Sequence, residues 1–516
     1  MTVIPPVARS PYPGLRPFER DEADVFFGRE THVDALVDRL AQRRLVAVTG
    51  GSGSGKSSLV RAGLLEALEA GLLVAAGPVW RFAIFRPSDH PMTELATALA
   101  EALGTQQTSD GVALRRAKLE RGPLSLVEEL REHPLPDRGN LLVLADQFEE
   151  LFRYQGLAAR EEAEAFVALL LVSTRQRQAP IYIVLTMRSD FLGRCAEFDG
   201  LAEAITDAQY LCPRLSREQS LSAIEGPANV FGGKVEPRLA ARIVNDMGND
   251  PDQLPLMQHL LMRLWQRAQA HNAKTSVLRL DDYIAEGGLK DSLSRHADEI
   301  LGEITATSPE RIETTRRLFC LLVDGEGENA VRRPTRVAEV MAITGKSVRE
   351  IASVADPFRA SGCSLLMPSL DRPLTPDTVL DLSHESLIRQ WQPLKDWVRT
   401  EVASAEQYRE IERRARRRRA GQGGVLAGID LDIALAWRDR ERPNRAWARR
   451  YGADFGLAIG FLEQSRVHRG TVQRVEAAEG KVLRLKTLVF FLSVSFILSF
   501  TTAIIFIFKY LNSRSF

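Results

Sequence analysis

The sequence predicts an α/β fold in which a five-stranded parallel sheet is followed by helical regions and one membrane-spanning helix. Three observations support this prediction. Short apolar runs with β-branched residues end in glycine-rich or acidic turns, as buried parallel strands do. The first of these runs leads into a glycine-rich loop and then into residues with helical spacing. Near the end of the chain lies a long segment without a charged residue.

The composition is that of a globular protein with several folded units. A chain of 516 residues suggests three or four domains at about 100–200 residues each. Hydrophobic residues at 45% and charged residues at 26% exclude a disordered chain. The four cysteines are widely spread and form no Cys-x-x-Cys pair, which argues against a disulfide framework or a structural zinc site and favours a reducing compartment: Cys195, Cys212, Cys320 and Cys363.

Charge is distributed unevenly along the chain. Residues 401–486 contain 19 Lys and Arg against 12 Asp and Glu, whereas residues 1–400 carry a net charge of −8. A basic neck thus follows an acidic body. This distribution argues against a general nucleic-acid binder, whose basic surface would cover the main domain.

The first strand is expected at Leu45–Thr49, and it leads directly into the motif G-x-x-x-x-G-K-[ST] at Gly50–Ser57. Glycines let backbone amides converge on phosphates, and the following helix adds a partial positive charge at its N-terminus. The order therefore predicts a P-loop that binds a nucleotide. Lys56 would reach the β- and γ-phosphates and the Ser57 hydroxyl would complete the shell of Mg²⁺. The expected phosphate-binding residues are Gly50, Ser52, Gly53, Ser54, Gly55, Lys56, Ser57 and Ser58.

A P-loop needs an acidic partner, and we expect it on a neighbouring strand. Leu141–Ala145 is such a strand and ends in Asp146, which would hold Mg²⁺ through water. Glu149, or else Glu150, would act as the general base that orients the attacking water. In the alternative interpretation these two glutamates only cap the first turn of the next helix.

A third strand is expected at Ile181–Arg188, with Arg188 at its carboxyl end. Ligands of doubly wound sheets bind beyond the carboxyl ends of the strands, so Arg188 could sense the γ-phosphate. The alternative is a surface arginine paired with Asp190. Residues 79–85 and Gln209–Leu211 complete the predicted five-stranded parallel sheet.

Leu488–Phe508 is predicted to span a membrane. The segment has 21 residues without a charge, of which 16 are apolar and six of these are Phe. As a helix it would be about 30 Å long, which is the thickness of the hydrocarbon core of a bilayer. The alternative is an unusually long buried core helix. A stripe of Ser495, Ser499 and Ala503 would let two such helices pack closely, unless these residues are ordinary passengers of a spanning helix.

No secretion signal is recognised at Met1–Arg16, which is Pro-rich and lacks an apolar core. Insertion is therefore expected through the C-terminal span after synthesis in the cytosol. Lys481, Arg484 and Lys486 precede the span, and a body of 486 residues is expected to stay in the cytoplasm.

Beyond these features, the chain resembles the STAND NTPases, and specifically the bacterial novel STAND NTPases (group 1-like). The similarity covers residues 12–400 well and extends thinly to residue 465. The segments that carry it, besides the P-loop, are Pro11–Phe18, Phe26–Glu30, Asp146–Glu150, Thr186–Phe191, Leu215–Gln219, Ile224–Ala228, Leu254–Gln258, Leu382–Arg389 and Phe461–Ser465.

The resemblance implies an α/β P-loop NTPase followed by a helical lid, a winged-helix domain and a helical neck. The implied boundaries are a tail at 1–11, the NTPase domain at 12–212, the lid at 213–270, the winged helix at 271–400, the neck at 401–486, the transmembrane helix at 488–508 and a short tail at 509–516. Its last winged-helix helix would cover about 385–399 and would be structural rather than DNA-binding.

The resemblance also implies a switch between ADP (off) and ATP (on), with Mg²⁺, and slow hydrolysis. Phe27, Gly28 and Arg29 would lie against adenine and ribose, and Pro255 would pack on the base. His384 would donate to the ADP β-phosphate and lock the closed form, although an ordinary core histidine is the equal alternative because the family's histidine motif is written differently here.

The implied partners are ATP, a membrane, other copies of the chain on activation, and a separate sensor or effector protein. Many relatives carry sensing repeats, and this chain shows no repeat of 20–50 residues. Either another protein or the neck would then detect the signal. The implied location is the inner membrane of a bacterium, with the NTPase body in the cytoplasm and a role in signalling or defence.

The neck contains an arginine run at 413–419, preceded by Glu406, Glu410 and Glu412. Glu-before-Arg spacing is typical of a solvated helix; the alternative is contact with anionic lipid headgroups. Trp437 and Trp447, with arginines around them, are open to the same two interpretations.

Two other functions stay open from the sequence. One is a nucleotide-binding scaffold with negligible turnover that recruits a partner to the membrane. The other, which we do not expect, is a transcription regulator that binds DNA through residues 271–400.

Overall fold

The structure is a computed structural model that describes residues 10–512, apart from residues 106–107, 153–156, 249–252, 272–275, 328–329 and 361. The described chain divides into two compact units. The first contains the residues up to 338 and residues 347–396, and the second contains residues 339–346 and the residues from 397 onward.

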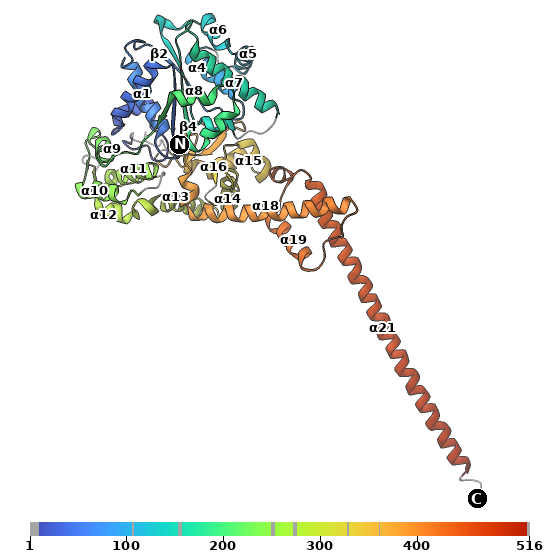
Figure 1. Ribbon diagram of the computed structural model, residues 1–516. Coiled ribbons are helices and arrows are strands. Elements are labelled where there is room, and N and C mark those ends of the chain that lie inside the picture. Colours follow the sequence, from blue (N-terminus) through green and yellow to red (C-terminus); the bar gives the residue numbers. More distant parts are fainter. Residues whose placement is uncertain are drawn as a thin grey trace. The chain divides into compact units, whose positions relative to one another are not determined.

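Five parallel strands form the main sheet of the first unit, in the order β2-β3-β4-β1-β5 (Figure 1). This confirms the predicted sheet. All residues of β1 and β3 are buried, because helices cover both faces, and such strands read as continuous apolar runs. The strands are β1 Leu45–Gly50, β2 Trp80–Phe85, β3 Asn140–Ala145, β4 Ile181–Arg188 and β5 Gln209–Leu211.

The strand order differs from the sequence prediction in one respect. β4 lies between β1 and β3, with Val48 opposite Thr186 and Leu144 opposite Val184. The acidic strand β3 is therefore not the direct neighbour of the P-loop strand. Asp146 still meets the P-loop helix because the carboxyl ends of all the strands lie at one edge of the sheet.

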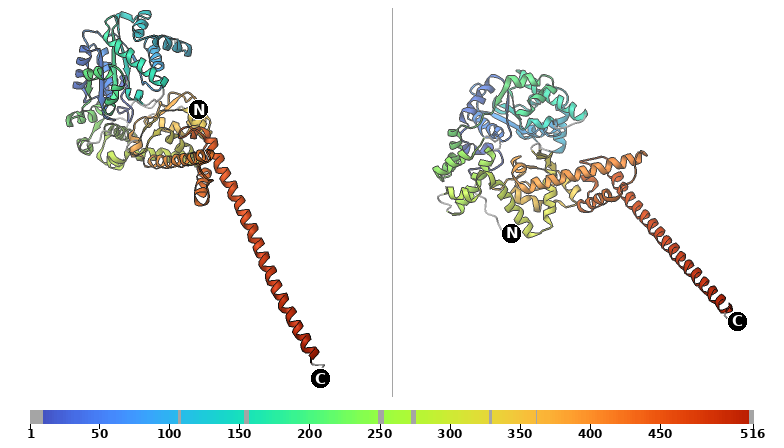
Figure 2. Two further views of the ribbon diagram at one scale, coloured as in Figure 1. Left: turned by 45° about the vertical axis from the view of Figure 1, so that its right-hand side comes forward. Right: turned by 60° about the horizontal axis from the view of Figure 1, so that its bottom comes forward.

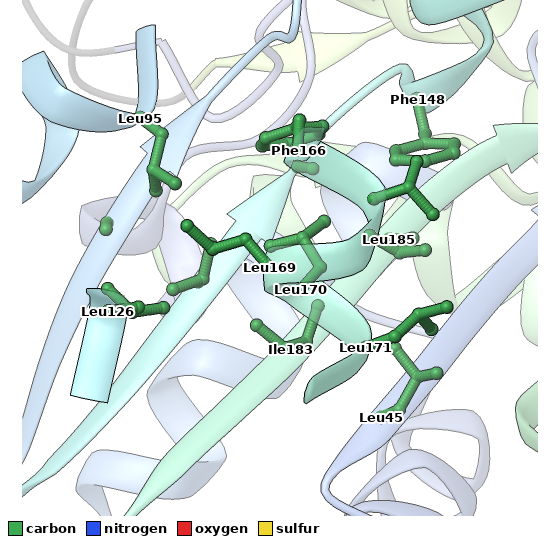
Figure 3. Close-up of a cluster of buried hydrophobic side chains, with 14 of the residues drawn as sticks. Leu45, Leu95, Leu126, Phe148, Phe166, Leu169, Leu170, Leu171, Ile183 and Leu185 are labelled. Atoms are coloured by element: carbon green, nitrogen blue, oxygen red, sulfur yellow. The ribbon is translucent and has the colours of Figure 1, made fainter. Parts of the chain in front are cut away.

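Each face of the sheet has its own hydrophobic core. On one face the side chains of α4, α6, α7 and α8 pack together, and Figure 3 shows Leu169 and Leu170 of α7 over Ile183 of β4. On the other face α1 and the helix after the P-loop cover alternate residues such as Val46 and Val48. The two cores hold the sheet rigid beneath its carboxyl edge.

The helices of this part vary from single turns to 19 residues. They are η1 Arg20–Val25, α1 Glu30–Gln42, α2 Lys56–Ser58, the π-helical η2 Leu59–Leu64, α3 Leu65–Glu69, α4 Pro91–Ala102, α5 Ser109–Leu119, α6 Ser125–Glu132, η3 Pro136–Arg138, η4 Phe148–Phe152, α7 Leu157–Arg175, η5 Ser189–Glu197 and α8 Leu201–Ala208.

A helical region follows the main sheet. It begins with a capping box, in which Ser216 and Gln219 each accept a hydrogen bond from the other's backbone N–H. The parallel pair β6–β7 crosses the expected lid boundary at residue 270, so that boundary stays a proposal. The elements are α9 Arg217–Val230, β6 Lys234–Val235, α10 Pro237–Asp246, α11 Gln253–His271, β7 Val277–Leu278, α12 Leu280–Ala285 and α13 Gly288–Thr307.

The last part of the first unit combines helices with a small antiparallel sheet of order β10-β12-β11. Phe319, Phe358 and Trp391 form its aromatic core, and Trp391 Nε1 donates to Asp298 at 2.8 Å. The winged-helix assignment of this part remains a prediction. The elements are α14 Arg311–Leu321, β8 Val323–Asp324, β9 Val331–Arg332, β10 Thr335–Arg336, α15 Val337–Thr344, α16 Val348–Arg359, β11 Leu366–Met367, β12 Val379–Leu382 and α17 Ser386–Gln390.

The helix expected at about 385–399 is in fact two helices. α17 ends at Gln390, Trp391 has an extended backbone, and α18 runs as one helix from Gln392 to Arg419. Trp391 is completely buried, and its position in the aromatic core accompanies the break. The expected boundary at residue 400 therefore falls inside a continuous helix.

The neck in the second unit is a folded helical cluster. Tyr408, Trp437, Trp447 and Tyr451 pack edge to face and in stacked pairs, and the two tryptophan N–H groups donate to Ser404 and Glu401. Both tryptophans are thus core residues rather than lipid contacts. The further helices are α19 Gly428–Glu441, α20 Arg445–Ala448 and α21 Phe455–Asn512.

The final helix α21 is continuous over 58 residues, as both views of Figure 2 show. Among the residues that the structure describes, it is the one helix long and apolar enough to cross a membrane, with a mean hydropathy of 2.4 and no burial in its most apolar window. The predicted span Leu488–Phe508 lies within it.

Candidate nucleotide-binding site

The P-loop bends sharply between β1 and α2. Gly53 and Gly55 have φ angles of +72° and +88°, a left-handed conformation that side chains with a Cβ rarely adopt. Lys56 follows, and its Nζ donates to the carbonyls of Gly50 and Gly51 at 3.1 and 2.7 Å. Burial lowers the pKa of Lys56. The loop thus presents backbone amides and one ammonium group to the same pocket.

Asp146 collects donors from three elements. Ser57 Oγ donates to its Oδ1 at 2.8 Å, Thr186 Oγ1 donates to the same oxygen, and Arg61 Nη2 lies 3.0 Å from Oδ2. The carboxylate is completely buried. Burial alone would raise its pKa, but Arg61 and Arg86, together with the two hydroxyl donors, hold the pKa of Asp146 below its ordinary value. It is therefore an anion.

The predicted Mg²⁺ ligands fit that ion. The Ser57 hydroxyl and the Asp146 carboxylate are hard oxygen donors, and their hydrogen bond places them side by side. In a nucleotide complex these two residues would hold Mg²⁺ directly or through water.

The turn after β3 positions the two glutamates differently. Gln147 has a φ of +59°, which is rare outside glycine, and its N–H donates to Thr186 Oγ1 at 2.9 Å. Glu149 lines the pocket, accepts from the Arg188 N–H at 3.2 Å, and has a pKa raised by burial. Glu150 is also buried but is not part of the pocket wall. Of the two candidates for the base, Glu149 has the better position.

Arg188 makes contacts on two sides. Its Nη2 donates to Asp190 Oδ2 at 2.7 Å, and its Nη1 lies 3.0 and 3.1 Å from the two carboxylate oxygens of Glu385. The guanidinium also forms part of the pocket wall. The expected alternative of a pair with Asp190 is thus present together with a position at the pocket.

The segment before α1 braces the P-loop. Gly28 has a φ of +82°, and a Cβ there would lie 2.4 Å from the carbonyl oxygen of Gln219. Phe27 packs its ring against Gly226 of α9. Arg29 is buried and donates to the carbonyls of Ser54 and Pro213 at 2.9 and 2.7 Å. Both Phe27 and Arg29 line the pocket.

The opposite end of the pocket is apolar and fits the flat face of a base. Pro255 lies there on α11, as expected, and Ser58 fixes the wall by accepting from the backbone N–H of Phe18 at 3.2 Å. The apolar side chains of this end are Leu15, Pro17, Phe18, Val25, Phe26, Phe27, Leu215, Ala223, Leu254, Pro255 and Met257.

His384 closes the phosphate end. Its Nδ1 accepts from the backbone N–H of Ser386 at 3.1 Å and lies 2.7 Å from Ser386 Oγ. Because Nδ1 accepts, the proton of the neutral ring is on Nε2. Burial, followed by the charges of neighbouring arginines and Lys56, lowers the pKa of His384 to about 3. The ring is therefore a neutral donor at physiological pH.

Most of the predicted site residues meet in this pocket. Its wall includes Phe27, Arg29, Ser52, Gly53, Gly55, Lys56, Ser57, Ser58, Glu149, Arg188, Pro255 and His384. The others support the wall or lie outside it: Gly28 and Gly50 shape turns, Ser54 accepts from Arg29, Asp146 acts through Ser57, and Glu150 lies outside.

Five further residues at the site were not predicted: Arg61, Arg86, Thr186, Arg332 and Glu385. Arg61 and Thr186 had a detectable signal, since one lies a turn after Ser57 and the other two residues before Arg188. Arg332 and Glu385 had none, because their partners are 185 and 197 residues away in sequence.

The fold and the pocket together define a P-loop nucleotide-binding protein. A family model, Novel STAND NTPase 1, matches residues 11–422, so the chain belongs to that family of NTPases. No curated protein matches the sequence. Similar solved structures include a Walker-type ATPase of Pyrococcus abyssi (14% identity, 75% of this chain and 99% of that chain covered, TM-score 0.38) and the ORC2 protein of Aeropyrum pernix in ADPNP–ADP complexes (13% identity, 73% and 95%, TM-score 0.41). A third is Cdc6p of Pyrobaculum aerophilum (13% identity, 72% and 94%, TM-score 0.33).

Proposed function

We propose that the chain is a membrane-anchored ATPase that acts as a nucleotide-dependent switch, off with ADP and on with ATP. One observation carries this proposal. Lys56 of the P-loop and His384, more than 300 residues later, line the same pocket. A nucleotide bound there would contact both, so its phosphates would control whether the two parts stay together.

His384 supports an ADP-bound off state. A neutral imidazole with its proton on Nε2 can donate to a phosphate oxygen without the cost of burying a second charge. Pro255 and the apolar end of the pocket would hold the base. The closed arrangement would thus bind both ends of ADP.

The residues needed for hydrolysis support a slow ATPase. Glu149 would accept the proton of the attacking water, and Lys56 and the P-loop amides would neutralise the phosphates. Mg²⁺, held by Ser57 and Asp146, would draw charge from the β- and γ-oxygens. Turnover in the closed form would be slow because Glu385 and Asp190 hold Arg188.

The remaining parts suggest how the signal is used. We infer that α21 anchors the body to a bacterial inner membrane through Leu488–Phe508, with the body in the cytoplasm, and that the ATP form oligomerises. A sensor or effector protein would supply the trigger. The resemblance to bacterial novel STAND NTPases supports signalling or defence as its setting.

The first test is the nucleotide that co-purifies with the full chain in mild detergent. Mass spectrometry should find ADP in stoichiometric amount, and the Lys56→Ala variant should retain much less. Mass photometry should then show larger particles after exchange for Mg²⁺ and a non-hydrolysable ATP analogue. Equal particle sizes with both nucleotides would contradict the switch.

Hydrolysis distinguishes the switch from a passive scaffold. The full chain should release phosphate from ATP faster than Lys56→Ala does, even if only a few turnovers per hour occur. If the two rates are equal while nucleotide still binds to the unaltered chain, the scaffold is the better explanation.

A further inference from the structure

We propose that Glu385 competes with the γ-phosphate of a bound nucleotide for Arg188, and that this competition makes the closed form select a nucleoside diphosphate over a triphosphate. The inference rests on the proposed function, because it concerns the nucleotide pocket described above. It adds a residue that discriminates between the two nucleotides.

The Glu385 carboxylate is a buried anion at the phosphate end of the pocket. Its side chain is 6% exposed, it forms part of the pocket wall, and both of its oxygens lie within 3.1 Å of Arg188 Nη1. Arg389, one helical turn later, contributes a second cation at 3.1 Å. A buried carboxylate is stable only with such partners, so Glu385 depends on Arg188.

Arg188 is the cation that the sequence assigns to the γ-phosphate. It ends β4, at the carboxyl edge where the nucleotide phosphates would lie. A guanidinium can pair with a carboxylate or a phosphate in the same geometry. Glu385 therefore gives Arg188 the kind of partner that a γ-phosphate would give it.

A second acidic residue joins the same segment to the sheet. Asp381 accepts from Arg86 at 3.2 Å and from Arg332 at 2.7 Å, and Arg332 also donates to Gln147 at 3.0 Å. Arg86, Gln147 and Arg188 follow or end three adjacent strands, β2, β3 and β4. The segment from Asp381 to Glu385 thus touches three strand ends of the nucleotide-binding edge through ionic and polar contacts.

The consequence differs for the two nucleotides. ADP leaves the pair of Arg188 and Glu385 intact, because it has no γ-phosphate. ATP brings additional negative charge toward Arg188, and this charge repels the Glu385 carboxylate in a site with little water. Binding of the γ-phosphate and release of the segment Asp381–Glu385 are therefore coupled, and by linkage each favours the other.

The test is Glu385→Gln in the full chain purified in detergent, which keeps the size of the side chain and removes its charge. We measure the affinities for Mg²⁺-ADP and for Mg²⁺ with a non-hydrolysable ATP analogue by calorimetry. The ratio of analogue affinity to ADP affinity should rise by about tenfold, which lies within the range of known couplings between sites. Glu385→Asp keeps the charge and should leave the ratio close to that of the unaltered chain.

A double variant tests whether the effect passes through Arg188. In an Arg188→Gln background, Glu385→Gln should change the ratio by less than about twofold, because the competition has been removed. A ratio that does not rise in Glu385→Gln, or that rises equally without Arg188, overturns the inference. If neither nucleotide binds the unaltered chain more tightly than Lys56→Ala, the proposed function itself fails.

Discussion

Single side chains at the phosphate end of the pocket are held by partners within the protein. Lys56 donates to P-loop carbonyls, Arg61 neutralises Asp146, and Arg188 pairs with Glu385. A nucleotide with Mg²⁺ would have to exchange several of these contacts for its own. Nucleotide binding is therefore an exchange of ion pairs, and the strength of each internal pair contributes to the selectivity of the site.

The pair of Arg61 and Asp146 should be important for stability. Replacement of Arg61 by Met leaves a buried carboxylate without its cation, and we expect the free energy of unfolding to fall by roughly 3–5 kcal/mol. Urea denaturation followed by tryptophan fluorescence measures this change. Arg116→Met, which breaks a pair with Glu120 on the surface, should cost less than about 1 kcal/mol. Equal losses in the two variants would show that Asp146 does not depend on Arg61.

The assignment of the general base predicts a difference between two adjacent residues. Glu149→Gln keeps the hydrogen bond from the Arg188 N–H but removes the base, and the rate of hydrolysis should fall by about 10²–10⁴-fold. ADP affinity, measured by calorimetry, should change little. Glu150→Gln should lower the rate much less, since Glu150 lies outside the pocket wall. A larger loss in Glu150→Gln would exchange the two roles.

At the scale of elements, the parts predictable from sequence were those with a local cause. β1, β3 and β4 are buried on both faces and appear as apolar runs, and the P-loop follows from its glycines. The insertion of β4 between β1 and β3, the strands of two residues such as β9 and β11, and the continuity of α18 had no such local signal. They depend on pairing partners far away in sequence. The contact of Glu385 with Arg188 belongs to this class.

The P-loop turn gives a prediction about backbone conformation. Gly55→Ala introduces no contact closer than 3.8 Å, so its effect comes from the φ of +88°. The left-handed conformation costs about 1–2 kcal/mol for a residue with a Cβ, and relief of this strain would turn amides away from the phosphates. We expect ADP affinity to fall at least tenfold by calorimetry. Gly122→Ala, with open space around its Cα, is the control and should leave affinity unchanged.

At the scale of the whole molecule, the body and the membrane segment make separate contributions. The neck has its own aromatic core, and several arginines of its basic run pair with acidic side chains, such as Arg414 with Glu410 and Arg416 with Glu412. These ion pairs leave less positive charge for lipid headgroups. Membrane attachment should therefore depend on Leu488–Phe508 rather than on the neck.

A truncated chain tests this division. The full chain expressed in bacteria should stay in the membrane fraction after an alkaline wash, because removal of a spanning helix from the bilayer exposes about twenty apolar residues to water. A chain that ends at Lys486 should appear in the soluble fraction and should still bind ADP. Its retention in the washed membranes would instead assign attachment to the basic neck.

Acid should destabilise the first unit through its buried histidines. His259 and His296 lie 3.0 Å apart with 0% and 6% exposed surface. Burial lowers the pKa of His259 well below its ordinary value and that of His296 to about 3. The unfolded chain takes up protons at these residues near pH 6.5, whereas the folded chain does not, so the free energy of unfolding should decrease as the pH falls from about 6.5 toward 3, by up to about 1.4 kcal/mol per pH unit for each histidine. Urea midpoints between pH 7.5 and 5 measure the slope. The double substitution His259→Gln and His296→Gln should reduce it, and an unchanged slope would mean that these two histidines are not the groups that titrate.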